Sequence, residues 1–208
     1  MQSTRSSEEP LHVGVILAGG RARRMGGGDK GLLELAGAPI LAHVIARLAP
    51  QVSRLALNAN GAPERFSGFG LPVLSDPIPG QPGPLAGILA GLDWAASLGA
   101  RAIVTAAADS PFFPHDLAAR LIAGAGPGSF ALAATREGLQ PTFGLWPVAL
   151  RDDLRAAIEG GARRVGEWAL LQGAARVPFP EGKPDPFFNI NTPEDLARAE
   201  EIMAGMKA

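Results

Sequence analysis

Short apolar runs alternate along the chain with longer segments of helical periodicity. The apolar runs end in glycine, asparagine or aspartate, which is typical of buried parallel strands. Between them, apolar residues recur at intervals of three and four, as at Leu41, Val44, Ile45 and Leu48, and this spacing predicts amphipathic helices. The predicted strands cover residues 11–17, 54–59, 71–74, 102–107, 129–135, 142–146 and 175–179.

This alternation predicts an α/β fold with a mostly parallel central sheet flanked by helices, because helices of about 10–15 residues between strands indicate βαβ crossovers. Residues 136–141 are predicted to be a loop between two strands. Thr192 is placed to cap the last helix, with Pro193 at its first position. The polar segment 1–10 is predicted to be a flexible tail, and residues 11–208 a single domain.

Composition excludes several classes of protein. The 208 residues contain no cysteine and carry a formal net charge of −1. The absence of cysteine excludes disulfides, thiolate zinc sites and cysteine nucleophiles, and we expect a cytoplasmic protein. The balanced charge gives no general attraction to nucleic acid or to a membrane surface. The three histidines lack metal-ligand spacing, and the chain has no G-x-S-x-G serine-hydrolase motif.

A glycine-rich segment follows the first predicted strand and is the strongest local signal. Residues 17–30 read LAGGRARRMGGGDK. Glycines let the backbone approach an anion closely, and three arginines with Lys30 supply positive charge. Because open sheets bind ligands at the carboxyl ends of their strands, this segment predicts a triphosphate site. It is not a P-loop, since no Gly-Lys-Ser/Thr ends it. A mobile surface turn with solvated arginines is the alternative interpretation.

Acidic and amide residues end the other predicted strands. Asp109 follows the 102–107 strand, where a carboxylate could hold Mg²⁺ shared with substrate phosphates or could cap a helix starting near Phe113. Asp76 and Asn58 end two earlier strands, where they could contact a base or ribose or could stabilise turns.

Asn189 and Asn191 flank Ile190 ahead of the last helix. Alternation places both side chains on one side of an extended segment. They could point into the site or only anchor the turn, and the local pattern favours the turn.

These motifs, in this order, resemble those of the molybdenum cofactor guanylyltransferase family. The matching segments are LAGG…ARRMGG…DKGLLEL (from Leu17), LNAN (57–60), GPLAG (83–87), DSPFFPHDLAARL (109–121), QPTFGLW (140–146), GARRV (161–165) and FFNINTPEDLARAE (187–200). They span nearly the whole chain. The resemblance implies a Rossmann-like nucleotidyltransferase fold and a Mg²⁺-dependent transfer of GMP from GTP to molybdenum-molybdopterin, with release of pyrophosphate.

The resemblance also implies roles for individual residues. Lys30 and Arg24 would hold the GTP phosphates, and Asp109 would reach GTP through Mg²⁺, which makes these three the expected catalytic residues. Asn189 and Asn191 match a pair that the family places near the pterin-side substrate. This resemblance favours a role in the site over a role in the turn alone. The residues that would line the GTP site are Leu17, Ala18, Gly19, Gly20, Asn58, Asp76 and Gly83.

The chain departs from the family at two places. It has Ala107-Ala108 where the family often has Pro-Cys, so a cysteine is not expected to be catalytic here. It has Gln140 where the family often has histidine, which puts any pterin contact of that histidine in doubt. By charge alone, Arg163, Arg164 and Lys183 are candidates to contact the pterin substrate.

Two alternatives stay open at this point. One is the same chemistry with another nucleotide or acceptor, such as a molybdopterin cytidylyltransferase, although Gly19-Gly20 resembles the guanylyl pattern more than the Ala-Gly usual in cytidylyl relatives. The other is a cofactor carrier without catalysis. We expect a monomer whose protein partners are molybdenum-insertion proteins and molybdoenzyme apoproteins.

Overall fold

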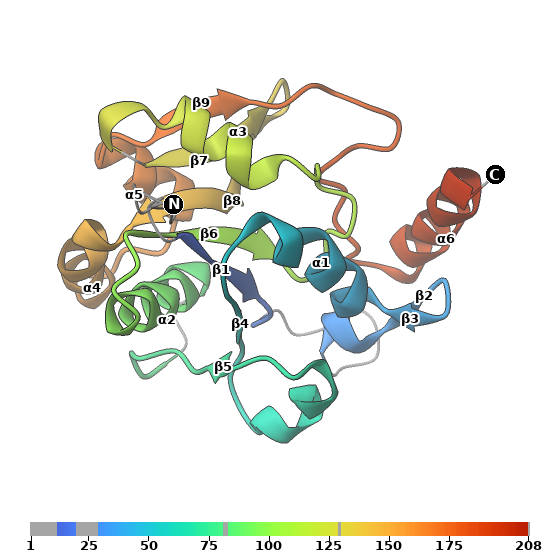
Figure 1. The fold of residues 1–208 in the computed structure, drawn as a ribbon, viewed down its shortest axis with the longest axis horizontal. Helices are drawn as coiled ribbons and strands as arrows, with labels where there is room; N and C mark the ends of the chain where they lie inside the picture. The colour runs from blue at the N-terminus through green and yellow to red at the C-terminus, as the bar shows by residue number, and fades with distance from the viewer. Residues whose placement is uncertain (1–11, 20–28, 81–82, 129, 208) are drawn as a thin grey trace, which may run out of the picture.

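A computed structural model describes residues 12–19, 29–80, 83–128 and 130–207, which form a central seven-stranded sheet with helices packed on it (Figure 1). The sheet order is β5-β4-β1-β6-β8-β7-β9. Only β8 runs antiparallel to its neighbours, so the predicted mostly parallel sheet is confirmed. The strands are β1 (His12–Leu17), β4 (Leu55–Asn58), β5 (Val73–Leu74), β6 (Ala102–Ala107), β7 (Ala131–Thr135), β8 (Gly138–Pro147) and β9 (Ala175–Pro178).

Apolar side chains cover both faces of the sheet, because every second residue of a strand points to the opposite face. On β1, Ile16 packs into one apolar cluster, whereas Val13 and Val15 pack into the other. The first cluster includes residues of helices α1 (Ile40–Leu48) and α3 (Leu117–Gly124). The second includes residues of α2 (Pro84–Ser97), α4 (Arg151–Glu159) and α5 (Val165–Leu171). Two buried faces explain why the strands read as continuous apolar runs.

The last helix, α6 (Pro193–Lys207), lies apart from the main sheet, beside a small hairpin of β2 (Glu34–Leu35) and β3 (Ala38–Pro39) (Figure 1). A third apolar cluster joins Leu35, Ile190 and Ala199. The predicted cap is confirmed, since the backbone N–H of Asp195 donates to the Thr192 hydroxyl at 3.2 Å. The hairpin was not predicted.

Two predicted boundaries are wrong. Residues 136–141 are not a loop, because β8 already begins at Gly138. Pro141 is tolerated there because the β7–β8 register shifts between Leu132 and Ala133, and within such a bulge a residue needs no ladder hydrogen bond. Helix α3 begins at Leu117 and not near Phe113, so Asp109 does not cap it. Within the described residues, no helix is long and apolar enough to cross a membrane.

Thr105 joins the central strand to the antiparallel one. Its buried hydroxyl accepts hydrogen bonds from Trp146 Nε1 at 2.9 Å and from the Gly144 N–H at 3.2 Å. We expect Thr105→Val to lower the free energy of unfolding by about 1–3 kcal/mol, because it leaves a buried indole N–H without an acceptor. Urea unfolding measures this loss, and the penalty should shrink in a Trp146→Phe background; an equal penalty there would contradict the assignment.

Candidate functional site

The carboxyl ends of three adjacent parallel strands form one edge of the sheet. They belong to β4, β1 and β6. Two backbone hydrogen bonds continue the pairing beyond the strands: Ala18 donates to Asn58 at 2.8 Å, and Ala108 donates to Leu17 at 3.2 Å. Since neighbouring strands lie about 4.8 Å apart, the ends of β4 and β6 are about 10 Å from each other. Residues far apart in sequence are thereby held in line at one edge.

Lys30 joins the end of β6 to the segment before α6. Its ammonium Nζ lies 3.3 Å from Asp109 Oδ2 and also donates to the side-chain oxygen of Asn191. The Lys30 and Asp109 side chains are only 16% and 21% exposed. Burial raises the pKa of Asp109 above its ordinary value, and the Lys30 ammonium opposes part of that rise. The cluster therefore pairs a partly desolvated carboxylate with a fixed positive charge.

Asn189 and Asn191 flank Ile190, the residue whose backbone pairs with Asp109. The backbone N–H of Ile190 donates to the Asp109 carbonyl at 2.9 Å, and the buried Ser110 hydroxyl donates to Asn189 Oδ1 at 2.5 Å. An ammonium can only donate, so the oxygen of Asn191 faces Lys30. Both amide oxygens are thus engaged by the protein, whereas no hydrogen bond of the two amide N–H groups is seen within the described residues.

Asp195 holds the backbone of this asparagine segment. One oxygen of its carboxylate accepts the N–H groups of Asn191 and Thr192, each at 2.9 Å. These hydrogen bonds hold the pKa of Asp195 below its ordinary value. The cap of α6 therefore also fixes the residue that binds Lys30.

A second cluster surrounds Asp76 at the ends of β4 and β5. Its two carboxylate oxygens accept hydrogen bonds from Asn58 Nδ2 at 2.9 Å and Asn60 Nδ2 at 2.8 Å. Asn60 Oδ1 in turn accepts the backbone N–H of Asp76 at 2.9 Å. Asn58 also donates to the Leu74 carbonyl at 3.1 Å and is 3% exposed. The two asparagines therefore fix the orientation of this carboxylate at the edge.

The other predicted site residues are placed as follows. Leu17, Ala18 and Gly19 lie at the end of β1 on this edge, and among the described residues, chain neighbours aside, no atom comes within 4 Å of a Cβ built on Gly19. Gly83 precedes the first turn of α2 with φ of +90°. Gly20 and Arg24 lie outside the described residues.

Arg163 and Arg164, which were predicted to contact the pterin, instead form hydrogen bonds and an ion pair within their own segment. Arg163 Nη1 donates to the carbonyls of Ile158 and Ala162, and Arg164 pairs with Glu167. Neither contact joins them to Lys30 or Asp109.

The sequence did not indicate Ser110, Asp29 or Arg65 as site residues. Ser110 could have been found only from its place next to Asp109. Arg65 could not have been found, because the sequence around it is that of an ordinary loop.

The residues around Asp109 fit a magnesium ion that shares its coordination with substrate. Within the described part of the chain, no group of three or more histidine, aspartate or glutamate side chains could hold a metal alone. Mg²⁺ usually takes one or two protein carboxylates and completes its shell with waters and substrate phosphates. The single Asp109 carboxylate matches that pattern.

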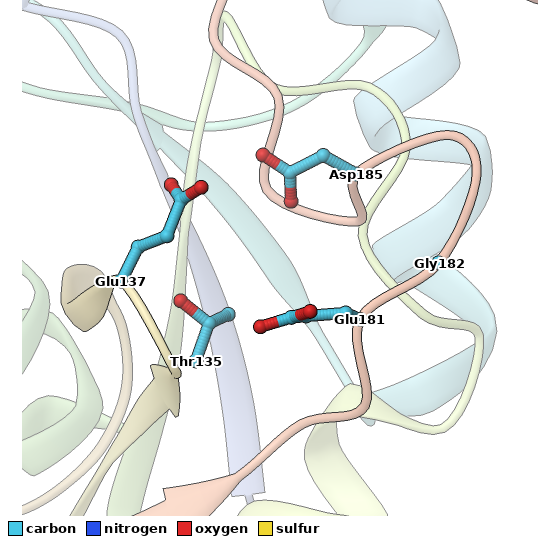
Figure 2. Close-up of a pocket in the computed structure, with 5 residues that line it drawn as sticks. All are labelled: Thr135, Glu137, Glu181, Gly182 and Asp185. Carbon is cyan, nitrogen blue, oxygen red and sulfur yellow. The ribbon is translucent and has the colours of Figure 1, made fainter.

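A separate hollow of about 170 Å³ lies between the β7–β8 turn and the segment after β9. Figure 2 shows its lining, with Glu181 pointing toward Thr135 and with Glu137 and Asp185 nearby. Three carboxylates in one small hollow disfavour an anionic ligand. Phosphate groups are therefore better accommodated beside Lys30 than here.

Comparisons with known proteins agree with this geometry. A family model described as a MobA-like NTP transferase domain matches residues 14–176. The chain is 53% identical over 204 residues to a molybdenum cofactor guanylyltransferase of Bradyrhizobium sp. (strain ORS 278), covering 96% of each chain. It is 53% identical over 190 residues to one of Cereibacter sphaeroides, covering 91% of this chain and 96% of that one.

A solved structure shows the same fold. The molybdopterin-guanine dinucleotide biosynthesis protein A from Archaeoglobus fulgidus superimposes with a TM-score of 0.74 at 26% identity, over 94% of this chain and 100% of that one.

Proposed function

This chain belongs to the molybdenum cofactor guanylyltransferases within the MobA-like NTP transferases, and we propose that it transfers GMP from GTP to molybdenum-molybdopterin in a magnesium-dependent reaction that releases pyrophosphate. The observation that carries this proposal is the meeting of Lys30, Asp109 and Asn191 at the carboxyl edge of the sheet. This meeting puts a fixed cation, a carboxylate and amide donors where a nucleotide and its acceptor would adjoin.

The reaction joins two polyanions, so the protein must offset their repulsion and align them. The terminal phosphate of molybdopterin attacks the α-phosphorus of GTP, a P–O bond forms, and the bond to pyrophosphate breaks. The nucleophile is already an anion, and little base catalysis is needed. Positioning and electrostatic stabilisation therefore account for most of the expected rate enhancement.

Lys30 would hold the phosphates of GTP and stabilise the charge that develops on the leaving pyrophosphate. Arg24 and the backbone N–H groups of the glycine-rich segment would assist it. Asp109 would hold Mg²⁺, which supplies Lewis-acid stabilisation of phosphate oxygens when it is bound. The Lys30 ammonium already lies beside the Asp109 carboxylate, so the ammonium and the Mg²⁺ would act on the same phosphate oxygens.

The two ends of the edge would bind different parts of the substrates. The Asn58–Asp76 cluster, at the β4 and β5 ends, would contact the nucleoside of GTP together with Leu17, Ala18, Gly19, Gly20 and Gly83. The amide N–H groups of Asn189 and Asn191 would donate to acceptor oxygens on the molybdopterin side. The separation of about 10 Å between the strand ends suits a triphosphate lying across them.

Calorimetric titration with GTP, CTP and ATP, each with Mg²⁺, tests the nucleotide. We expect GTP to bind at least about tenfold more tightly than CTP, a difference of about 1.4 kcal/mol. A preference for CTP would place the protein with cytidylyltransferases. Pyrophosphate release with GTP, Mg²⁺ and molybdenum-molybdopterin then tests catalysis, and nucleotide binding without release would indicate a cofactor carrier.

Two glycines of α2 offer a matched test of the Asn58 assignment. A Cβ on Gly87 would lie 2.1 Å from Asn58 Oδ1, whereas a Cβ on Gly91 would lie 2.8 Å from Ile103 Cδ1 and 2.9 Å from Val15 Cγ2. Both alanine variants should lose stability through overpacking, by about 1–3 kcal/mol. Only Gly87→Ala displaces Asn58, and we expect it to weaken GTP binding about tenfold.

Titration of both variants with GTP and Mg²⁺, at a temperature where each is folded, measures the difference. Equal affinities in the two variants would contradict a role for Asn58 in binding the nucleotide.

We further propose that the protein works in the cytoplasm as a monomer. It would receive its acceptor from molybdenum-insertion proteins and pass its product to molybdoenzyme apoproteins.

A further inference from the structure

Arg65 connects two segments of the sheet edge that are distant in sequence. It belongs to the 3₁₀ helix η3 (Pro63–Phe69), which lies between β4 and β5. Its guanidinium donates from Nη1 to the Ala62 carbonyl at 2.6 Å and from Nη2 to the Asn60 carbonyl at 2.5 Å. The same group forms an ion pair with Asp29, whose Oδ1 lies 3.4 Å from Nη2.

Two partners of Arg65, Asp29 and Asn60, lead to the two clusters of the site. Asp29 directly precedes Lys30, and its carbonyl accepts the Leu32 N–H at 3.1 Å at the start of the turn η1 (Lys30–Leu32). Asn60 binds both the carboxylate and the backbone of Asp76. The path from Lys30 through Arg65 to Asp76 is thus made of adjacent residues and hydrogen bonds.

The surroundings of Arg65 indicate a specific, partly buried contact rather than a solvated surface ion pair. The Arg65 and Asp29 side chains are 27% and 22% exposed, and the guanidinium carbon lies 4.6 Å from the Phe66 ring centroid. A Cβ on Gly61 would lie 3.1 Å from Arg65 Nη1, and Gly61 has φ of +86°. Only glycine suits that backbone and leaves room for the guanidinium.

We propose that Arg65 is a positioning residue that holds Lys30 at the working distance from the Asp76 cluster, without itself contacting the reacting atoms. This inference rests on the proposed function, because it assigns Lys30 to the phosphates and Asp76 to the nucleoside of one GTP. The forked guanidinium binds two carbonyls and a carboxylate at once, which a lysine ammonium cannot do with the same geometry. A direct phosphate contact would instead depend mainly on positive charge.

Four variants test the proposal, with wild-type protein and Arg155→Ala as references. Arg155 pairs with Asp93 at 2.8 Å between α4 and α2, with similar partial exposure, so its loss is the matched structural control. We expect Arg65→Ala and Asp29→Ala each to lower kcat/KM for GTP about tenfold or more, through both kcat and KM. Arg65→Lys should stay close to Arg65→Ala, and the double variant Asp29→Ala/Arg65→Ala should be no worse than either single change.

Several results would overturn the proposal. One is unchanged kinetics in Arg65→Ala, and another is near wild-type kinetics in Arg65→Lys, which would indicate a simple countercharge. Losses that multiply in the double variant would show that Asp29 and Arg65 act independently. Equal kinetic losses in Arg155→Ala would show a general effect of removing an ion pair.

A nucleotide-free measurement separates this proposal from the proposed function. Amide hydrogen exchange of residues 29–35 should be faster in Arg65→Ala than in Arg155→Ala, because the tether on Asp29 is lost. If wild-type protein fails to bind GTP, the proposed function fails while this comparison still tests the tether. If wild type binds GTP but exchange and affinity are unchanged in Arg65→Ala, the positioning role fails alone.

Discussion

Replacing Asp109 with alanine should abolish nearly all GMP transfer, with a loss of about 10³-fold or more in kcat. Asp109 is the only residue proposed to hold Mg²⁺, and its carboxylate also lies 3.3 Å from the Lys30 ammonium. The variant removes a partly buried carboxylate whose pKa is raised by burial, so its fold should persist. Pyrophosphate release with saturating GTP, acceptor and Mg²⁺ measures the loss.

Two further variants define what the carboxylate contributes. Asp116→Ala removes an exposed carboxylate near the start of α3 that pairs with Arg120, and it should keep full activity. Asp109→Asn keeps an oxygen that can accept from Lys30 but removes the negative charge, so it should be nearly as inactive as the alanine variant. Normal turnover of purified Asp109→Ala with Mg²⁺ would refute the metal assignment.

Replacing Lys30 with alanine should lower turnover by about 10²–10³-fold, the usual effect of losing one preorganised electrostatic donor. The ammonium is held by Asp109 and Asn191 before any substrate binds, so no reorganisation is needed when the phosphates arrive. The loss should fall mainly on kcat, because charge builds on the leaving pyrophosphate in the transition state.

Lys30→Met separates the charge from the bulk of the side chain, and it should be about as inactive as the alanine variant. Arg101→Ala is the reference for losing a positive charge, because Arg101 precedes β6 at the opposite edge of the sheet. Steady-state kinetics over a range of GTP concentrations measure both parameters. Substantial activity in Lys30→Met would show that the ammonium does not stabilise the transition state.

The sheet could be predicted because its strands are buried on both faces and end in turn-forming residues. The segment Ala102–Ala107 is predicted with both bounds correct, since a short, mainly apolar run with β-branched residues and turn residues after it is typical of a buried strand. The strand β8 was harder, because Gly138 and Pro141 read locally as turn residues. Only its pairing with β7 and β6 makes an extended backbone favourable there.

The site could be predicted only as far as strand ends indicate it. Asn58 is the last residue of a strand, Asp109 and Asp76 come just after strands, and parallel order brings those strand ends to one edge. The contacts of Asn191 and Arg65 could not be predicted, because they depend on how α6 docks on the β2–β3 hairpin and how η3 folds back toward Asp29. Local patterns carry no information about such long-range packing.

The hydrogen bond from Lys30 to Asn191 joins residues 161 positions apart, which bears on how the protein is made. During translation the ribosome adds Lys30 and the strands β1, β4 and β6 long before Asn191. A growing chain can therefore begin to assemble its sheet while this arrangement of Lys30 is still impossible. Because a ligand stabilises only the state that binds it, GTP would protect released protein from unfolding but would not rescue translation products that stop before residue 191.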